Sequence, residues 1–339
     1  MNALDPHPGT DPPPGTLSRR HWLALAAASA SPLLATQSRA QAFPAKPLRM
    51  IVGFATGGAN DIVARMLAEP MGQALGQPVI VENKPGADAI VAAEYVARSQ
   101  GDGYTLFFAG SGPLTINPAI YAKLPYDAVK DFTPISTVGT LGVVIATRPD
   151  LGAKTVADVI RLARDRPQGL SFGSGSTSFR IAGETFARQA GIKLLHVPYK
   201  GGGPAVQALA GGDIDLMFAD PASVVSLASA GRILALAITS EPRPQSMPNL
   251  PTVAESGLPD FDFNFFIGLA APAATPAEIV RRVSEAVGAS LNQPALRERM
   301  LALGIRPAAS TPQQATDRIR RDIDRFTAIA QAANIRAGA

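Results

Sequence analysis

Short apolar segments alternate with segments of helical periodicity along most of the chain. Many apolar segments are hydrophobic at every position, which is typical of strands covered by helices on both faces. They predict strands at 49–54, 78–82, 105–109, 142–147, 170–173, 194–198, 214–219, 234–239 and 263–270. The periodicity between them predicts helices at 62–75, 88–99, 156–165, 180–190, 204–211 and 222–230. This repetition of strand and helix predicts parallel α/β layers.

Three polar sequences predict where helices begin. Thr155 followed by Asp158 forms a variant capping box. The sequences TPAE (275–278) and TPQQ (311–314) each place threonine at the N-cap, proline at the first helical position and Glu or Gln at the third. The last two sequences predict a C-terminal region that contains helices and no strands.

One proline conflicts with the helical pattern. Pro70 falls within the apolar periodicity of the predicted helix 62–75. A proline inside a helix costs about 3 kcal/mol or kinks the helix. We therefore expect a break near Glu69.

The first 42 residues have the order of an export signal. The basic sequence SRRHWL (18–23) precedes an alanine-rich apolar stretch, and AQA (40–42) forms a small-x-small cleavage site. The apolar stretch is shorter than the about 20 residues that span a bilayer. The adjacent arginines favour the twin-arginine route, and the general secretory route is the alternative. Either route, with cleavage after about Ala42, predicts a protein of the periplasm.

Composition restricts the chemistry that the chain can perform. It has no cysteine and three histidines, of which His7 and His21 belong to the predicted signal. Thiol catalysis, disulfides and multi-histidine metal sites are therefore excluded, and a Ser-His-Asp triad would need His196. We expect His196, on an apolar strand, to be packed and hydrogen-bonded. The formal net charge of +4 comes without a basic run, so nucleic acid is not an expected partner.

Polar, glycine-rich sequences follow several predicted strands and run into helices. They lie at 54–61, 109–112, 173–178, 197–203 and 218–221. Parallel strands end at one edge of a sheet, glycines allow the backbone to approach a ligand, and helix starts present free N–H groups. These features favour a small carboxylate as ligand. The Walker, G-x-G-x-x-G and G-x-S-x-G spacings are absent, and no motif pairs a nucleophile with a base.

These loops supply the candidate ligand-binding residues, and no catalytic or metal-binding residue is predicted. Each candidate also has a structural interpretation, as a turn glycine, a helix cap, a dipole partner or a solvated side chain. The candidates are Thr56, Gly57, Gly58, Asp61, Ser111, Ser176, Thr177, Ser178, Arg180, Tyr199 and Asp220.

Arg180 stands in the first turn of a predicted helix. A cation there opposes the helix dipole by about 0.3–1 kcal/mol and needs a compensating partner. An anionic ligand would supply that partner, and a solvated surface arginine is the alternative. If the ligand is the partner, replacing Arg180 by Ala should weaken carboxylate binding at least tenfold.

The same segments, in this order, resemble the extracytoplasmic solute-binding receptors of tripartite tricarboxylate transporters, the Bug family. The resemblance covers nearly the whole chain after the predicted signal. Its landmarks are KPLR (46–49), FATGGAND (54–61), VENKPGA (81–87), DGYTL (102–106), LPYD (124–127), KDF (130–132), HVPYKG (196–201) and LPTVAESG (250–257).

The resemblance implies an α/β fold of the type II periplasmic-binding-protein class, a two-lobed Venus flytrap clamshell with hinge strands. Residues 44–145 plus 264–339 would form lobe 1 and residues 146–263 lobe 2. A small organic acid would bind between the lobes, with one carboxylate on the first glycine-rich loop. The resemblance implies a monomer without cofactor or catalysis, which serves membrane transporter subunits or a sensor kinase.

This chain departs from the family pattern at three places. Thr56 replaces a proline of the first loop, Phe179 and Arg180 replace a Thr or Asn followed by His, and Ala219 precedes Asp220 where the acid usually comes one residue earlier. These departures favour a di- or tricarboxylate, or an aromatic acid stacked on Phe179, over an amino acid. An exported enzyme for a small anionic substrate and a non-transporting interaction protein stay open as alternatives.

Overall fold

The computed structural model describes residues 43–240, 243, 245–261, 263–332 and 334–336. The predicted export signal, residues 1–42, lies outside the described residues. Within the described part of the chain, no helix is both long and apolar enough to cross a membrane.

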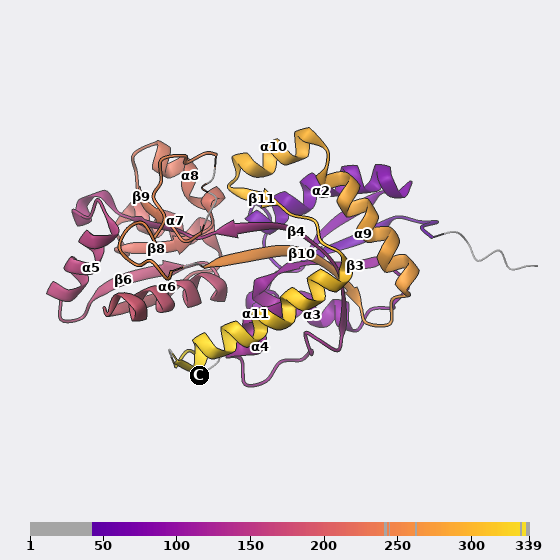
Figure 1. Cartoon of the computed structure of the whole chain (residues 1–339), viewed down its shortest axis with the longest axis horizontal. Helices are drawn as coiled ribbons and strands as arrows, with labels where there is room; N and C mark the ends of the chain where they lie inside the picture. The colour runs from indigo at the N-terminus through magenta and orange to yellow at the C-terminus, as the bar shows by residue number, and fades with distance from the viewer. Residues whose placement is uncertain (1–42, 241–242, 244, 262, 333, 337–339) are drawn as a thin grey trace, which may run out of the picture. The chain divides into compact units, whose positions relative to one another are not determined.

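A mixed sheet of the order β11-β4-β10-β3-β1-β2 forms the first half of the fold (Figure 1). Strand β1 pairs in parallel with β2 and β3, whereas β10 runs antiparallel to β3 and β4, and β11 antiparallel to β4. The strands are β1 (Leu48–Val52), β2 (Val79–Asn83), β3 (Thr105–Gly110), β4 (Phe132–Gly142), β10 (Asn264–Pro272) and β11 (Ile305–Pro307).

A second sheet of the order β7-β6-β8-β5-β9 forms the other half. Strand β6 is parallel to β7 and β8, and β5 is antiparallel to β8 and β9. The strands are β5 (Val144–Thr147), β6 (Leu170–Ser174), β7 (Leu194–Pro198), β8 (Leu216–Ala219) and β9 (Leu234–Ile238). The two sheets confirm the two-lobed α/β fold.

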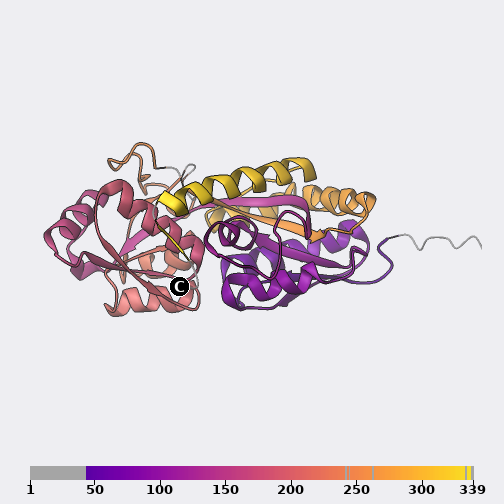
Figure 2. The same ribbon diagram turned by 90° about the horizontal axis from the view of Figure 1, so that it is seen from below.

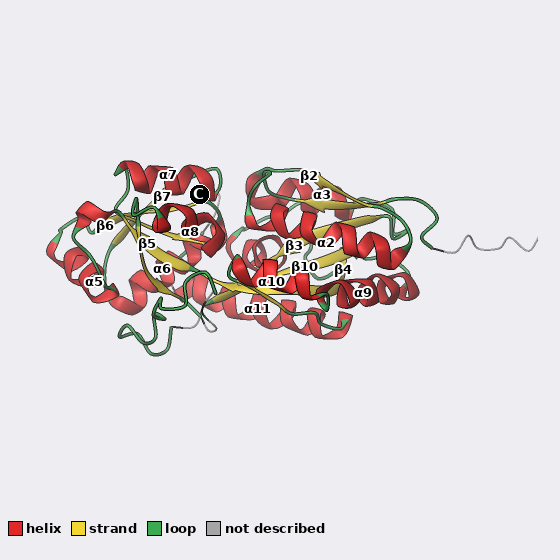
Figure 3. Cartoon of the chain, turned by 90° about the horizontal axis from the view of Figure 1, so that it is seen from above, coloured by secondary structure: helices red, strands yellow, loops and turns green. Residues whose placement is uncertain are grey.

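Helices cover both faces of each sheet (Figure 3). In the first sheet, Met50 of β1 packs in one core cluster with residues of α2 and α9, while its neighbour Ile51 packs with residues of α3. This alternation explains why the strand is apolar at every position. The helices are α2 (Ala59–Leu75), α3 (Ile90–Ala97), α4 (Asn117–Ile120), α5 (Val156–Asp165), α6 (Thr177–Ala190), α7 (Gly202–Gly211), α8 (Pro221–Ser229), α9 (Ala277–Leu291), α10 (Pro294–Ala302) and α11 (Pro312–Ala332).

The chain passes between the sheets twice, directly after Gly142 and again between β9 and β10. Thr239 joins the two passages. Its hydroxyl oxygen accepts a hydrogen bond from the backbone N–H of Val143 at 2.8 Å, and the hydroxyl donates to the carbonyl of Phe263. In Figure 2, α11, drawn in yellow, runs along the first sheet, where it contacts β4.

All predicted strands are present, and the sequence missed β4 and β11. The prediction of a C-terminal region without strands is wrong, because β11 pairs with β4 as a short edge strand. The prediction of a break near Glu69 is also wrong, because α2 continues through Pro70 to Leu75. Leu67, Met71 and Leu75 are buried on both sides of Pro70. The packing of these side chains outweighs the one backbone hydrogen bond that proline removes.

Two of the three predicted caps are present. Thr155 and Asp158 form a full capping box, and Thr311 and Gln314 exchange hydrogen bonds of 2.9 and 3.2 Å. The predicted cap at Thr275 is wrong. Helix α9 begins after Pro276, and the buried hydroxyl of Thr275 has no hydrogen-bond partner in the described structure.

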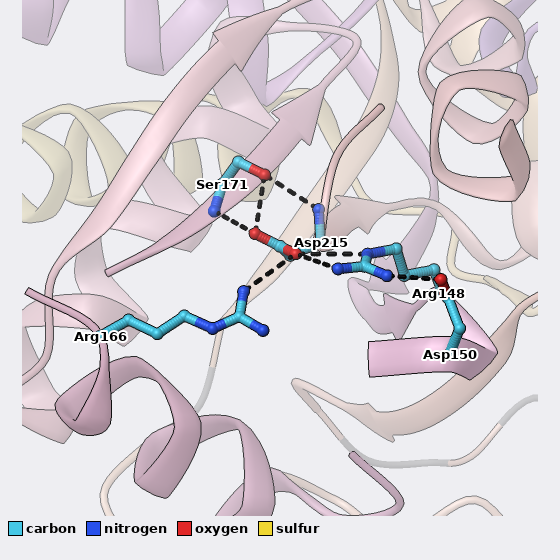
Figure 4. A network of polar contacts seen from close by, with 5 residues as sticks. All are labelled: Arg148, Asp150, Arg166, Ser171 and Asp215. Atoms are coloured by element: carbon cyan, nitrogen blue, oxygen red, sulfur yellow. Dashed lines mark hydrogen bonds and ion pairs between the residues drawn. The ribbon is translucent and has the colours of Figure 1, made fainter. Parts of the chain in front are cut away.

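A polar network lies at the edge of the second sheet where β6 and β8 begin (Figure 4). The carboxylate of Asp215 accepts hydrogen bonds from the backbone N–H and the hydroxyl of Ser171, each at 2.9 Å. It also accepts from Arg148 at 2.9 Å and from Arg166 at 3.4 Å. The network ties three segments together at the sheet edge opposite the carboxyl ends of these strands.

Candidate ligand-binding cleft

A cavity of about 830 Å³ lies where the loops of both sheets converge. Most of its lining comes from the segments that follow β1, β2 and β3 in the first sheet and β6, β7 and β8 in the second, and β4 and β10 add Leu141 and residues 265–267. Because parallel strands end at a common edge, each sheet presents three loops there, as open α/β sheets do for their ligands. The predicted binding residues that line the cavity are Thr56, Gly57, Gly58, Ser111, Ser176, Ser178, Tyr199 and Asp220.

The first loop presents backbone N–H groups to the cavity. Helix α2 begins after Gly58, and no side chain caps this start. Gly57 has a φ of +89°, a conformation that glycine adopts without a Cβ clash. The unsatisfied N–H groups and the positive end of the helix dipole make this loop a suitable place for a carboxylate.

Asp61 lies behind this loop, outside the cavity lining. Its side chain is 2% exposed. Its carboxylate accepts hydrogen bonds from the N–H of Gly57 at 3.0 Å, from Asn83 at 2.8 Å and from Arg65 at 3.0 Å. Burial alone would raise the pKa of Asp61, but the hydrogen bonds from Arg65, Gly57 and Asn83 lower the pKa below its ordinary value. Asp61 therefore stays ionised and holds the first loop in place.

The loops of the second sheet approach each other through glycine backbones. A Cβ at Gly175 would lie 2.3 Å from the carbonyl carbon of Gly201 and 2.4 Å from the nitrogen of Gly202. Only glycine permits this approach. Ser176, beside Gly175, is the N-cap residue of α6, yet its side chain makes no capping hydrogen bond.

Two other lining residues already have partners within the protein. The carboxylate of Asp220 caps α8, because it accepts from the N–H of Ser223 at 2.9 Å and from the Ser223 hydroxyl at 2.8 Å. Burial raises the pKa of Asp220, although these hydrogen bonds act in the opposite direction. The hydroxyl oxygen of Ser111 accepts from the N–H of Phe266 at 3.0 Å. Ser111 therefore retains its hydroxyl proton for donation.

Thr177 and Arg180 do not line the cavity. The Nε of Arg180 is 3.8 Å from Glu184, one turn along α6, and the charge of Arg180 also acts on Asp88. The charges of Glu184 and Asp88 thus act on Arg180, but its buried Nε has no hydrogen-bond partner in the described structure. A direct role of Arg180 in binding stays a prediction.

Asp88, which the sequence analysis missed, lines the cavity. Its Oδ1 accepts a hydrogen bond from the backbone N–H of Thr177 at 3.2 Å. The segment from Gly86 to Ala89 has positive φ at four successive residues, of 145°, 45°, 52° and 68°. Left-handed backbone costs about 1–2 kcal/mol for each non-glycine residue. Such strain clusters at binding sites and is a signal of function.

Charge is sparse and aromatic surface is abundant along the cavity. Among the described lining residues, the charged ones are Asp88, Lys200 and Asp220. The aromatic lining residues are Phe54, Phe179, Tyr199, Phe265 and Phe266. The cavity thus combines polar loop ends with an apolar wall, as small-molecule sites do.

One serine and histidine meet close to the cleft. The Oγ of Ser174 and the Nε2 of His196 are 2.8 Å apart, and His196 stacks at a tilt on Phe172. This arrangement confirms the prediction of a packed, hydrogen-bonded histidine. Burial lowers the pKa of His196 to about 4, which makes it a poor base at neutral pH. Neither residue lines the cavity. Among the described residues, no group of three or more acids and histidines is placed to hold a metal ion.

Two α/β sheets, joined by two passages of the chain and sharing one cavity at their strand ends, define the class of two-lobed solute-binding receptors. The chain belongs to the tripartite tricarboxylate transporter family of receptors, whose sequence model matches residues 63–335. The resemblance found in the sequence is thereby confirmed. Members of this family are solute-binding receptors and not enzymes.

Three relatives illustrate the similarity. BugT of Bordetella pertussis is 32% identical over 299 residues, which are 87% of this chain and 92% of BugT. The structure of Rpa4515 of R. palustris with adipate has a TM-score of 0.83 and 30% identity, and the match covers 87% of this chain and 99% of Rpa4515. MatC of Rhodopseudomonas palustris, with bound malate, has a TM-score of 0.78 and 30% identity, covering 85% of this chain and 99% of MatC.

Proposed function

We propose that the chain is an exported receptor that captures a small organic carboxylate in the cavity between its sheets. One observation carries the proposal: the loops after six parallel strands, three in each sheet, converge on a single cavity of about 830 Å³. The structures of Rpa4515 with adipate and of MatC with bound malate support a carboxylate as the ligand class.

In this proposal, one ligand carboxylate lies at the start of α2. The N–H groups of Thr56 and Gly58 would bind it, because this helix start lacks a side-chain cap, whereas the N–H of Gly57 donates to Asp61. The rest of the binding wall would include Ser111, Ser176, Ser178, Tyr199 and Asp220. Three residues outside the lining would support this wall: Asp61, Thr177 and Arg180.

The receptor would work in the periplasm as a monomer. We propose lobe limits of 44–145 plus 264–339 and of 146–263, with hinge bending where the chain passes between the sheets. The closed receptor would deliver its ligand to the membrane subunits of a tripartite tricarboxylate-type transporter, or signal to a sensor kinase. No catalytic step and no cofactor is part of this function.

Calorimetric titration of residues 43–339 with a panel of small carboxylates tests the proposal. We expect saturable binding of at least one acid with one site per chain, and the same acid should raise the melting temperature. Native mass spectrometry of protein purified from the periplasm should detect a co-purified small acid. A folded protein that binds no acid of the panel, or that converts the bound acid into product, would contradict the proposal.

A further inference from the structure

The carboxylate of Asp88 occupies the start of α6, within the cleft. Its Oδ1 accepts from the N–H of Thr177, the first residue of α6, and its Oδ2 is 3.4 Å from the hydroxyl of Tyr121. Asn117 donates to the carbonyl oxygen of Asp88 at 3.0 Å. These contacts hold a protein carboxylate where a helix start would otherwise attract an anionic ligand group.

The backbone of this segment directs the side chain of Asp88 toward α6. The positive φ of 52° at Asp88 is flanked by positive φ at Ala87 and Ala89. The contacts of Asp88 with Thr177, Asn117 and Tyr121 maintain this unfavourable conformation. The carboxylate of Asp88 is therefore held in a defined position in the cleft wall.

The charges of the described lining residues oppose a ligand with several carboxylates. The lining includes two acids, Asp88 and Asp220, and one base, Lys200, and the charge of Arg180 acts on Asp88 from outside the lining. Asp220 is buried and accepts two hydrogen bonds from Ser223, so it does not attract an anionic ligand. A second ligand carboxylate directed toward α6 would meet the negative charge of Asp88.

The remaining wall suits an apolar body. Phe54 and Phe179 are partly exposed and line the cavity together with the buried Phe265. The rings of Phe179 and Phe265 meet edge to face, with centroids 5.9 Å apart and an interplanar angle of 74°. A ligand ring placed beside them would bury apolar surface and make favourable aromatic contacts.

We propose that the ligand is an aromatic monocarboxylate and that Asp88 is the residue that rejects a second carboxylate. The carboxylate lies on the first loop, the ring lies against Phe54 and Phe179, and Asp88 faces the distal end of the ligand. This proposal rests on the proposed function, because it names the ligand class of the same cavity.

A matched pair of ligands tests the proposal. Benzoate and terephthalate share the ring and differ by one para carboxylate. In calorimetry at pH 7.5 we expect benzoate to bind residues 43–339 at least tenfold more tightly than terephthalate. Asp88→Asn keeps an acceptor for the N–H of Thr177 and removes the charge, so the ratio of the two affinities should fall at least fivefold.

Two further variants keep the test decisive. Asp88→Gly suits the positive φ, so it should fold even if Asp88→Asn does not, and it should also lose the discrimination. Asp165→Asn removes a solvent-exposed charge at the end of α5 and should leave the ratio unchanged. Equal binding of both acids, tighter binding of terephthalate, or an unchanged ratio in the Asp88 variants overturns this inference and leaves the receptor function intact. Failure of the folded protein to bind any acid of the panel overturns the receptor function itself.

Discussion

The carboxylate of Asp88 accepts a hydrogen bond from the backbone N–H of Thr177 at 3.2 Å, and this contact joins the two sheets across the cleft. Asp88 belongs to the segment after β2, whereas Thr177 begins the helix after β6. The hydroxyl of Thr177 also donates to Asn117 at 3.3 Å, which adds a second polar contact at the same place. These two hydrogen bonds therefore connect the two halves of the protein beside the cavity.

The charge of Arg180 acts on Asp88, and replacing Arg180 tests whether its positive charge contributes to ligand binding. Arg180→Ala should weaken carboxylate binding at least tenfold, which corresponds to about 1.4 kcal/mol. The physical reason is the loss of a half-buried positive charge, 30% exposed, beside Asp88 and Glu184. Calorimetry with the tightest acid of the panel measures the effect. Arg188→Ala, an exposed change on the same helix, is the control. Unchanged affinity in Arg180→Ala would remove Arg180 from the binding site.

The approach of two glycine backbones makes Gly175 sensitive to substitution. Gly175→Ala would place a Cβ 2.3 Å from the carbonyl carbon of Gly201, so the two loops must separate. We expect a loss of about 1–3 kcal/mol in the free energy of unfolding and at least tenfold weaker ligand binding. Urea unfolding and calorimetry measure the two effects. Gly211→Ala is the control, because its nearest neighbour would lie at 3.9 Å. Similar behaviour of the two variants would show that the close approach is not required.

Local sequence was sufficient to place most of the fold. Strand β3, in the middle of the first sheet, is apolar after Thr105, and Ser111 and Gly112 follow it directly. Because parallel strands share an edge, the strand-end argument also located most of the cavity wall. The same argument applied to the segment after β2 would have included Asp88.

Strand β4 shows what local sequence could not supply. Its residues Ser136 and Thr137 are buried, and a polar pair beside Pro134 does not indicate a strand. The hydroxyls of Ser136 and Thr137 donate to the carbonyls of Ser310 and Ala308 at 2.9 and 2.6 Å. Partners so distant in sequence leave no local signal, which is why both β4 and its neighbour β11 were missed.

The role of Asp88 depends equally on tertiary structure. An aspartate in a loop, two residues after a glycine, is typical of a solvated turn. Here α6 approaches from the second sheet, and the carboxylate is partly buried against Thr177 and Tyr121. Burial raises the pKa of Asp88, and the hydrogen bonds from Thr177 and Tyr121 oppose the shift. The residue type is visible in the sequence, but only the packing of α6 shows where the carboxylate lies.

His196 should make the stability of the protein depend on pH. Its pKa is lowered from 6.5 to about 4 by burial, and the positive charge of Arg180 acts in the same direction. Between these values the unfolded chain binds a proton that the native protein does not, so stability increases with pH. The contribution is complete above pH 6.5 and is lost as the pH falls toward 4. After allowance for partial exposure, we expect a loss of about 1–2 kcal/mol.

Urea unfolding at several pH values between 7.5 and 4.5 measures this dependence. His196→Gln preserves a polar group for Ser174 and cannot titrate, so its stability should change less over the same window. The carboxyl groups of Asp88 and Glu184, whose pKa values are raised by burial, act with the opposite sign in both proteins. The difference between wild type and variant therefore isolates the histidine. Parallel curves for the two proteins would refute the assignment.

The network around Asp215 should contribute to the stability of the protein and not to ligand binding. Asp215→Asn removes the charge that faces Arg148 and Arg166 and weakens the hydrogen bonds from Ser171 (Figure 4). The side chain of Asp215 is 14% exposed, so we expect the free energy of unfolding to fall by about 1–3 kcal/mol. Ligand affinity should stay within twofold, because the network lies at the sheet edge opposite the cavity. Asp150→Asn is the control, because this partner of Arg148 is 74% exposed and should change stability by less than about 0.5 kcal/mol. If Asp215→Asn weakened binding as strongly as it weakened folding, the two ends of the second sheet would be coupled, and the Asp215 network would serve binding as well as stability.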